Sequence, residues 1–153
     1  MEKSSSKVPN DLIGIAGVHY VVSELSRRGL IALPTIRNTA GIDIIVSKPD
    51  ATAQAFLQVK TSLKKVKFWP VSRPEKCLKG PRSFYVFLRF LQEEDRFEVF
   101  IESDNEVIKQ VRENLENYKK RGRKEFAYWI LPSSDSDIRK LHERWESWQP
   151  PLI

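Results

Sequence analysis

The first pattern along the chain is a set of residues at helical spacing near its start. Asn10 or Asp11 can cap a helix that continues to about Arg28, and Gly29 follows as a residue typical of helix ends. Steps of three and four residues place one set on the face expected to pack inward: Ile13, Gly17, Tyr20 and Glu24. A carboxylate on such a face is costly unless it is paired or the face ends at a cleft, so Glu24 stands out.

Three short apolar segments follow, and their richness in Ile, Val, Leu and Phe is typical of strands. They cover residues 30–36, 42–47 and 55–61, with a turn expected at 38–41. The second and third are joined by a short polar loop, which predicts a hairpin. Strand alternation places Phe56, Gln58 and Lys60 on one face of the third segment.

The second half of the chain repeats strand and helix patterns. Residues 83–90 and 96–102 predict an antiparallel pair, and 104–120 an amphipathic helix. A last strand is expected within 125–131, before a closing helix that begins at Ser134 or Ser136 and is sealed onto the sheet by Trp145 and Trp148. Residues 63–82, interrupted by three prolines, predict a loop with one short helix. This order predicts an α/β fold in which helices flank a mixed central sheet.

Several polar residues interrupt these apolar segments where a plain core element would have none. Asp43 begins one strand, Gln58 and Lys60 lie on the next, and Glu24 lies on the first helix. Two carboxylates and an amide oxygen form the hard oxygen environment that suits Mg²⁺ or Mn²⁺. A nearby lysine can orient a water molecule and stabilise negative charge. Together these groups point to hydrolysis of a phosphodiester.

The same stretches resemble the PD-(D/E)XK nuclease superfamily, which has the restriction-endonuclease-like fold. The resemblance covers roughly residues 11–100 and includes "GVHYVVSELSRRG", "TAGIDIIV" and "FLQVKTS". It implies an α-β-β-β-α-β core and a Mg²⁺-dependent or Mn²⁺-dependent deoxyribonuclease. The metal ligands implied are Glu24, Asp43, Gln58 and the Val59 carbonyl, and Lys60 would position the attacking water. The triplet reads Gln-Val-Lys rather than Glu-Val-Lys, as in Mrr-like and Holliday-junction-resolvase-like branches.

A second aspartate competes with Asp43 for the catalytic role. The pair Pro49-Asp50 imitates the name of the superfamily, but it lies in the polar loop between two strands. Proline and aspartate are routine turn formers in such loops. Asp43 lies at the start of an apolar strand beside the Gln58–Lys60 triplet, so we expect Asp43 to be the functional aspartate.

The charge distribution favours a polyanionic partner. The net charge is +6, and residues 60–82 hold eight basic side chains against one acidic side chain. Residues 92–117 reverse this balance, with nine acidic side chains against three basic ones. We expect nucleic-acid contacts from the basic tract, and five residues are candidates: Lys64, Lys65, Lys67, Trp69 and Arg73. A further basic run, KKRGRK at 119–124, is another candidate for phosphate contacts.

Each assignment has an alternative that the sequence leaves open. Glu24 could pair with Arg27 or Arg28, and Trp69 could anchor its loop to the core. Gln58 could be an ordinary strand residue, and Lys60 could extend along the sheet edge. A chain that kept the nuclease fold and lost the chemistry would be a binding module for nucleic acid or protein. The sequence does not separate DNA from RNA as the partner.

Length and composition limit the remaining possibilities. A chain of 153 residues has the size of one domain, and we expect residues 1–10 to be a flexible lead to a domain at 11–153. No apolar stretch approaches the roughly 20 residues that cross a bilayer, and the lone Cys77 excludes an internal disulfide. These features predict a cytoplasmic protein. Enzymes of the restriction-endonuclease-like fold commonly pair, so a homodimer is possible.

Overall fold

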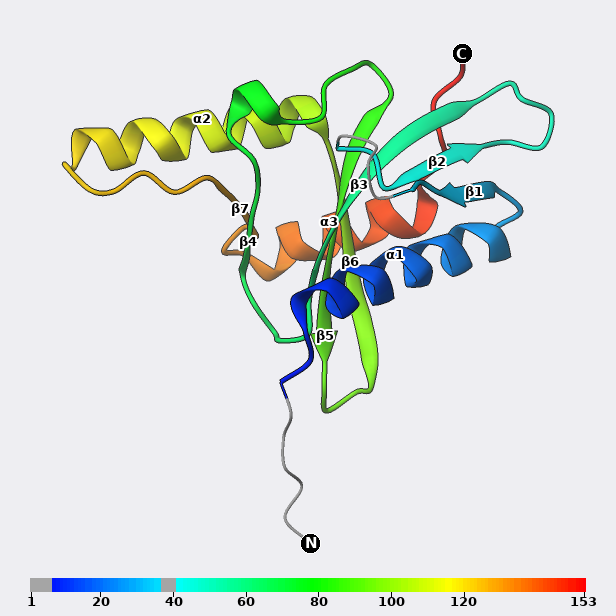
Figure 1. The fold of residues 1–153 in the computed structure, drawn as a ribbon, viewed down its shortest axis with the longest axis horizontal. Coiled ribbons are helices and arrows are strands. Elements are labelled where there is room, and N and C mark those ends of the chain that lie inside the picture. The colour runs from blue at the N-terminus through cyan, green and yellow to red at the C-terminus, as the bar shows by residue number, and fades with distance from the viewer. Residues whose placement is uncertain (1–6, 37–40) are drawn as a thin grey trace, which may run out of the picture.

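A mixed sheet of five strands forms the centre of the protein. The structure, a computed structural model, describes residues 7–36 and 41–153. In sheet order the strands are β1 (Ile31–Pro34), β2 (Ile44–Ser47), β3 (Gln54–Ser62), β5 (Ser83–Leu91) and β6 (Arg96–Ser103). Only the central pair β3–β5 is parallel; the other neighbours are antiparallel. The predicted fold class, α/β with a mixed sheet flanked by helices, is confirmed (Figure 1).

The hairpin expected between residues 42 and 61 is present as β2 and β3. Its register pairs Ile44 with Leu57 and Ser47 with Gln54. β3 has nine residues and β2 only four, so the last five residues of β3, 58–62, extend beyond the first residue of β2. The polar residues of interest lie where β2 has ended and β3 continues.

One face of the sheet is covered by α1 (Asn10–Arg27) (Figure 1). Its N-cap is Pro9 and carries no side-chain hydrogen bond, so neither Asn10 nor Asp11 caps the helix as expected. The inward face also differs from the predicted one, because the buried residues are Gly17, Val21 and Leu25. The helix is rotated so that Glu24 lies beside the buried stripe rather than on it.

The opposite face is covered by α2 (Asp104–Lys120) and by a small two-stranded sheet, β4 (Phe68–Pro70) and β7 (Tyr128–Ile130) (Figure 1). The basic segment expected to be a loop therefore contributes one strand as well as the short 3₁₀ helix η1 (Pro74–Lys76). Trp69 and Trp129 face the main sheet, where the Trp129 ring stacks on Phe87 with centroids 4.1 Å apart.

The closing helix α3 (Asp135–Ser147) packs along β6 and contributes to the two hydrophobic clusters, one on the α1 side of the sheet and one on the α2 side. Its N-cap is Ser134, one of the two predicted caps, whose hydroxyl accepts a hydrogen bond from the Asp137 N–H at 3.1 Å. Trp145 and Trp148 are buried against the α1 side of the sheet, as expected, while Leu141 joins the α2 side. Across residues 7–36 and 41–153, no helix is long and apolar enough to span a bilayer.

Candidate functional site

Asp43 lies at the edge of β3, immediately before β2 begins. Its backbone N–H donates to the Leu57 carbonyl at 2.8 Å, which continues the hairpin beyond the last regular pair. Its carboxylate Oδ2 accepts a hydrogen bond from the Val59 N–H at 2.7 Å. Because β2 has ended at this level, the side chain of Asp43 takes the amide that a strand carbonyl would otherwise occupy. The carboxylate is thereby fixed next to the Gln58–Val59–Lys60 segment.

Gln58 and Lys60 flank the Val59 amide along β3. The parallel register pairs Gln58 with Tyr85 and Lys60 with Phe87. Side chains of paired residues lie on the same face, so Gln58 and Lys60 face the side covered by α2 and the β4–β7 pair. Both residues are half-buried. Continuing the β2–β3 register by one residue from the Ile44–Leu57 pair places Asp43 opposite Gln58. The backbone register therefore places Asp43 next to Gln58, with Lys60 two residues further along the same face of β3.

Glu24 is the predicted residue that the structure places elsewhere. Its carboxylate lies 3.5 Å from Arg27 Nε and 3.9 Å from a guanidinium nitrogen of Arg28. Tyr20, on the same side of α1, packs on Phe97 of β6 with ring centroids 4.9 Å apart. β6 is the strand furthest from β1 and is separated from β2 by β3 and β5. Glu24 thus takes the alternative role of an ion-pair partner, on the side of α1 directed away from Asp43.

A different carboxylate of α1 shares a cavity with Asp43. The cavity has a volume of about 260 Å³, and its lining includes Asp11, Gly14, Val18, Asp43 and Val59. Asp11 lies in the first turn of the helix, where we considered it only as a cap. The proximity in space of the first turn of α1 to the part of β3 that extends beyond β2 could not be predicted from the sequence. This proximity depends on how closely α1 packs on β3, and the close packing is possible because Gly17, which has no side chain, lies against Thr61.

The competing aspartate, Asp50, has a local structural role. Its Oδ1 accepts hydrogen bonds from the Thr52 N–H at 3.0 Å and from the Thr52 hydroxyl at 2.7 Å. These two bonds lower the pKa of the exposed Asp50 carboxyl. The bonds are those of an Asx turn between β2 and β3. Asp50 therefore shapes the hairpin loop, as expected for the Pro49-Asp50 pair.

The basic tract after β3 divides into exposed and buried members. Lys64, Lys65 and Lys67 are exposed, and Arg73 pairs with Glu125 at 3.1 Å. Trp69 is 2% exposed, and its indole N–H donates to the Leu88 carbonyl at 2.9 Å. A ring in this position cannot stack on a base, so Trp69 is corrected from a nucleic-acid contact to the core anchor that we considered as its alternative. The lysines remain predicted contacts.

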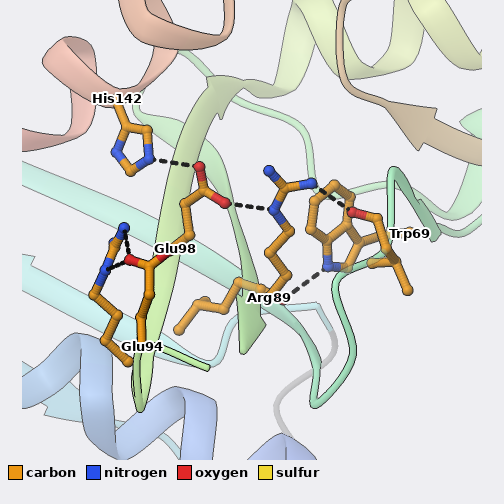
Figure 2. Close-up of polar contacts among 8 residues, drawn as sticks. Trp69, Arg89, Glu94, Glu98 and His142 are labelled. Atoms are coloured by element: carbon orange, nitrogen blue, oxygen red, sulfur yellow. Dashed lines mark hydrogen bonds and ion pairs between the residues drawn. The ribbon is translucent and has the colours of Figure 1, made fainter. Parts of the chain in front are cut away.

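A buried ionic network fixes the path of this basic tract (Figure 2). Arg89 Nε donates to Glu98 Oε2 at 2.5 Å, and the same guanidinium donates through Nη1 to the Val66 carbonyl at 2.9 Å. His142 Nε2 lies 2.8 Å from Glu98 Oε1. Burial alone would raise the pKa of Glu98, but hydrogen bonds from His142 and Arg89 and the charge of Arg89 lower it to about 2. The ionised Glu98 thus holds Arg89, which holds the lysine-bearing segment.

The donor set near Asp43 determines which metal could bind there. Within residues 7–36 and 41–153, no three His, Cys, Asp or Glu side chains gather as a metal-binding group. The oxygen donors near Asp43 come from both sides of the sheet edge. Gln58, next to Asp43 in the register, faces the α2 side, whereas Asp11 lines the cavity with Asp43 and Val59 on the α1 side. A set with few carboxylates and several neutral oxygens fits Mg²⁺, which keeps several of its waters. It does not fit zinc, which prefers nitrogen and sulfur ligands.

Comparisons with known proteins extend the interpretation of the fold. No family model matches the chain, and no curated protein matches it. Among solved structures, that of the bacterial homing endonuclease I-Ssp6803I is similar over 90% of this chain and 89% of its own. The TM-score is 0.51 and the sequence identity 10%, so the similarity is one of fold. The chain therefore has a nuclease-like fold.

Proposed function

We propose that this chain is a metal-dependent deoxyribonuclease of the PD-(D/E)XK type. The observation that supports it most strongly is the hydrogen bond from the Val59 N–H to the Asp43 carboxylate, in a chain whose fold resembles an endonuclease. This bond holds an acidic residue beside Gln58 and Lys60. An acid at the start of one strand, next to a Gln-x-Lys triplet on its antiparallel neighbour, is the arrangement that the resemblance implies.

The proposed metal ligands are the Asp43 carboxylate, the Gln58 side-chain oxygen and the Val59 carbonyl. Asp11 is proposed as a further carboxylate donor in place of Glu24, because it shares a cavity with Asp43; it would approach the metal from the α1 side of the sheet edge, opposite the side that Gln58 faces. A carboxylate has about four acceptor positions, so the bond from Val59 leaves Asp43 able to bind a cation. Mg²⁺ or Mn²⁺ held there would acidify a water and offset charge on the scissile phosphate.

The remaining work falls to basic side chains. The Lys60 ammonium would orient the attacking water and stabilise the negative charge that grows on the phosphate oxygens. Lys64, Lys65 and Lys67, which follow directly along the chain, would hold the DNA backbone. Arg73 would contribute to the same contact after its exposed ion pair with Glu125 opens. Such exposed pairs cost little to break.

The test compares Asp43, the proposed metal ligand, with Asp50, which lies in the hairpin loop. Wild type, Asp43→Asn, Lys60→Gln and Asp50→Asn are incubated with supercoiled, linear, single-stranded and branched DNA in Mg²⁺, Mn²⁺ or EDTA. We expect cleavage by wild type and Asp50→Asn in either metal and none in EDTA. Asp43→Asn and Lys60→Gln should each lose about 100-fold or more of the rate. Asp50→Asn controls for the loss of one negative charge.

Two results would reject the proposal. Equal cleavage by Asp43→Asn and wild type would show that the site is wrong or that a contaminant cuts the DNA. Absence of cleavage on every substrate, with salt-dependent DNA binding retained in EDTA, would favour the binding module instead. The neutral Gln58, at a position where a carboxylate is common, would then explain the absence of catalytic activity.

A further inference from the structure

The outer face of the β4–β7 pair carries apolar side chains that the core does not use. The register pairs Trp69 with Trp129, and both rings point inward and are almost fully buried. Strand alternation therefore turns the flanking residues outward. Phe68 is 47% exposed and its partner Ile130 is 39% exposed. Since two tryptophans already fill the space beneath, the outer face is not needed to complete the core.

Four aromatic rings cluster around Tyr128 on this outer side, and we name them the aromatic platform: Phe68, Phe126, Tyr128 and Tyr118. Phe126 stacks on Tyr128 with ring centroids 5.6 Å apart and planes 26° apart. Phe68 meets Tyr128 edge-on at 5.8 Å, and Tyr118 meets Tyr128 edge-on at 6.1 Å. Phe126 is 41% exposed. Among the described residues, Phe68 and Phe126 are the exposed members of Phe, Tyr and Trp, and both belong to this platform.

Basic residues flank the platform along the chain, and the acidic residue among them, Glu125, is paired with Arg73. The chain between α2 and β7 carries exposed Arg121, Arg123 and Lys124, and exposed Lys67 precedes Phe68. Arg121 and Arg123 also line a polar hollow of about 140 Å³ together with Tyr118 and Tyr128. A hollow of this size beside two guanidinium groups could accept a phosphate. Exposed rings next to cations are the two components by which proteins hold unpaired strands.

The backbone fixes the two arginines in this position. The end of α2 is closed by a pair of bonds in which the Gly122 N–H donates to the Lys119 carbonyl and the Arg123 N–H donates to the Tyr118 carbonyl, at 3.1 and 3.0 Å. This is the Schellman arrangement, and Gly122 has the positive φ of 61° that it requires. The chain therefore reverses directly beside the Tyr118 ring, which brings Arg123 to the platform.

The platform is also connected to the candidate site. Lys60 lies opposite Phe87, and Phe87 stacks on Trp129 of β7. Only residues 61–67 separate Lys60 from Phe68, and three of them are exposed lysines. A strand that leaves the candidate site along these lysines would reach the platform.

We propose that the aromatic platform binds the unpaired bases of a DNA strand, so that the favoured substrate contains a single-stranded segment. The choice of DNA as the polymer rests on the proposed function; the binding itself does not require cleavage. Bases would stack on Phe68 and Phe126, while Arg121, Arg123 and Lys124 would contact the phosphates. A protein partner would also cover exposed rings, but the surrounding cations favour a polyanion.

The test measures binding in EDTA by fluorescence anisotropy, so that it is independent of catalysis. The probes are labelled oligothymidylate of roughly 20 nucleotides, an abasic oligonucleotide of equal length, a duplex and an oligouridylate. The abasic probe keeps every phosphate and lacks every base. The full-length variants are Phe68→Ala, Phe126→Ala and Phe126→Trp. Leu33→Ala is the matched control, since Leu33 is 57% exposed on β1 at the far edge of the sheet.

We expect wild type to bind oligothymidylate at least about fivefold more tightly than the abasic probe, the lower limit of stacking on one base. Phe68→Ala and Phe126→Ala should remove most of that preference, and Phe126→Trp should keep it. Leu33→Ala should bind like wild type. Phe126 lies outside any strand, so Phe126→Ala remains decisive if Phe68→Ala does not fold.

Equal affinity of wild type for the thymidylate and abasic probes would overturn the proposal. Unchanged binding by Phe126→Ala would do the same. Tighter binding of oligouridylate than of oligothymidylate would replace DNA by RNA as the ligand and overturn the proposal as stated. If wild type prefers the probe with bases but cleaves no DNA, the proposed nuclease function is rejected while base binding by the aromatic platform is supported.

Discussion

Gly17 of α1 and Thr61 of β3 lie so close that a methyl group added to Gly17 would come within 1.8 Å of the Thr61 hydroxyl oxygen. The Thr61 Cβ would lie only 2.8 Å away, so rotation of the threonine cannot remove the clash. This contact sets how deeply α1 rests on the sheet. It thereby sets the width of the cavity shared by Asp11 and Asp43.

Gly17→Ala should destabilise the protein by about 1–3 kcal/mol, the usual cost of overpacking, because α1 must move away from β3. The measurement is the midpoint of urea unfolding followed by tryptophan fluorescence. Gly14→Ala is the matched control, since nothing lies within 4 Å of the added methyl group. Its expected effect is a stabilisation of up to about 1 kcal/mol from better helix propensity. Similar midpoints for the two variants would contradict the close contact.

Glu98→Gln should be far more damaging than Glu94→Gln, although both remove one carboxylate from an arginine (Figure 2). Glu98 pairs with Arg89, and both side chains are about one-tenth exposed. Losing one partner of a buried pair costs roughly 3–5 kcal/mol, because the other charge stays buried. Glu94 and Arg96 pair at 2.6 Å but are half exposed, which limits the loss to about 1 kcal/mol. The measurement is the thermal unfolding of both variants, and equal losses of stability would argue against a buried Arg89 charge.

Acid should remove the contribution of Glu98 to stability. The folded protein lowers the pKa of this carboxyl from 4.5 to about 2, so the folded state binds the proton more weakly than the unfolded state. The stabilisation is fully present above about pH 5 and is lost as the pH falls from there toward 2. Urea unfolding at a series of pH values should show wild type losing stability over this range more steeply than Glu98→Gln. Parallel pH profiles would refute the assignment.

Glu24→Gln should leave DNA cleavage unchanged, whereas Asp11→Asn should reduce it at least about tenfold. Glu24 pairs with the neighbouring Arg27 and Arg28 on the side of α1 away from Asp43, while Asp11 shares the cavity of Asp43. Initial rates in Mg²⁺ with the substrate cleaved best by wild type measure both effects. If Glu24→Gln loses activity and Asp11→Asn keeps it, the helix glutamate implied by the family resemblance is functional after all.

The fold was largely predictable because most of its helices and strands have clear local sequence signals. The hairpin of β2 and β3, the pair β5–β6 and the cap at Ser134 follow from alternation, turn composition and hydroxyl capping. Strand β4 was missed because Phe68–Pro70 is three residues long and is strand only through its pairing with β7. The expected turn at 38–41 lies mostly in residues 37–40, outside the described residues.

The candidate site was predictable only in part, for a geometric reason. Asp43 and the triplet are neighbours in one hairpin, so strand periodicity alone brings them together. Which residue of α1 joins them depends on how the helix is rotated and where it crosses β3. Helical spacing suggested Glu24, but α1 rests on β3 with Gly17 against Thr61, and in this orientation Asp11, not Glu24, lines the cavity. The metal, the cytoplasmic location and the possible homodimer stay predictions.

The single parallel pair of the sheet, β3–β5, also bears on how the chain acquires its structure. The hairpins on either side of it, β2–β3 and β5–β6, join residues close in sequence and can form early. Pairing β3 with β5 requires the loop of residues 63–82 to close, and loop closure costs conformational entropy before the stabilising contacts form. Since Arg89 holds Val66 in that connection, formation of the buried ionic network should coincide with the slow step. The same residues that order the basic tract would then set the folding rate.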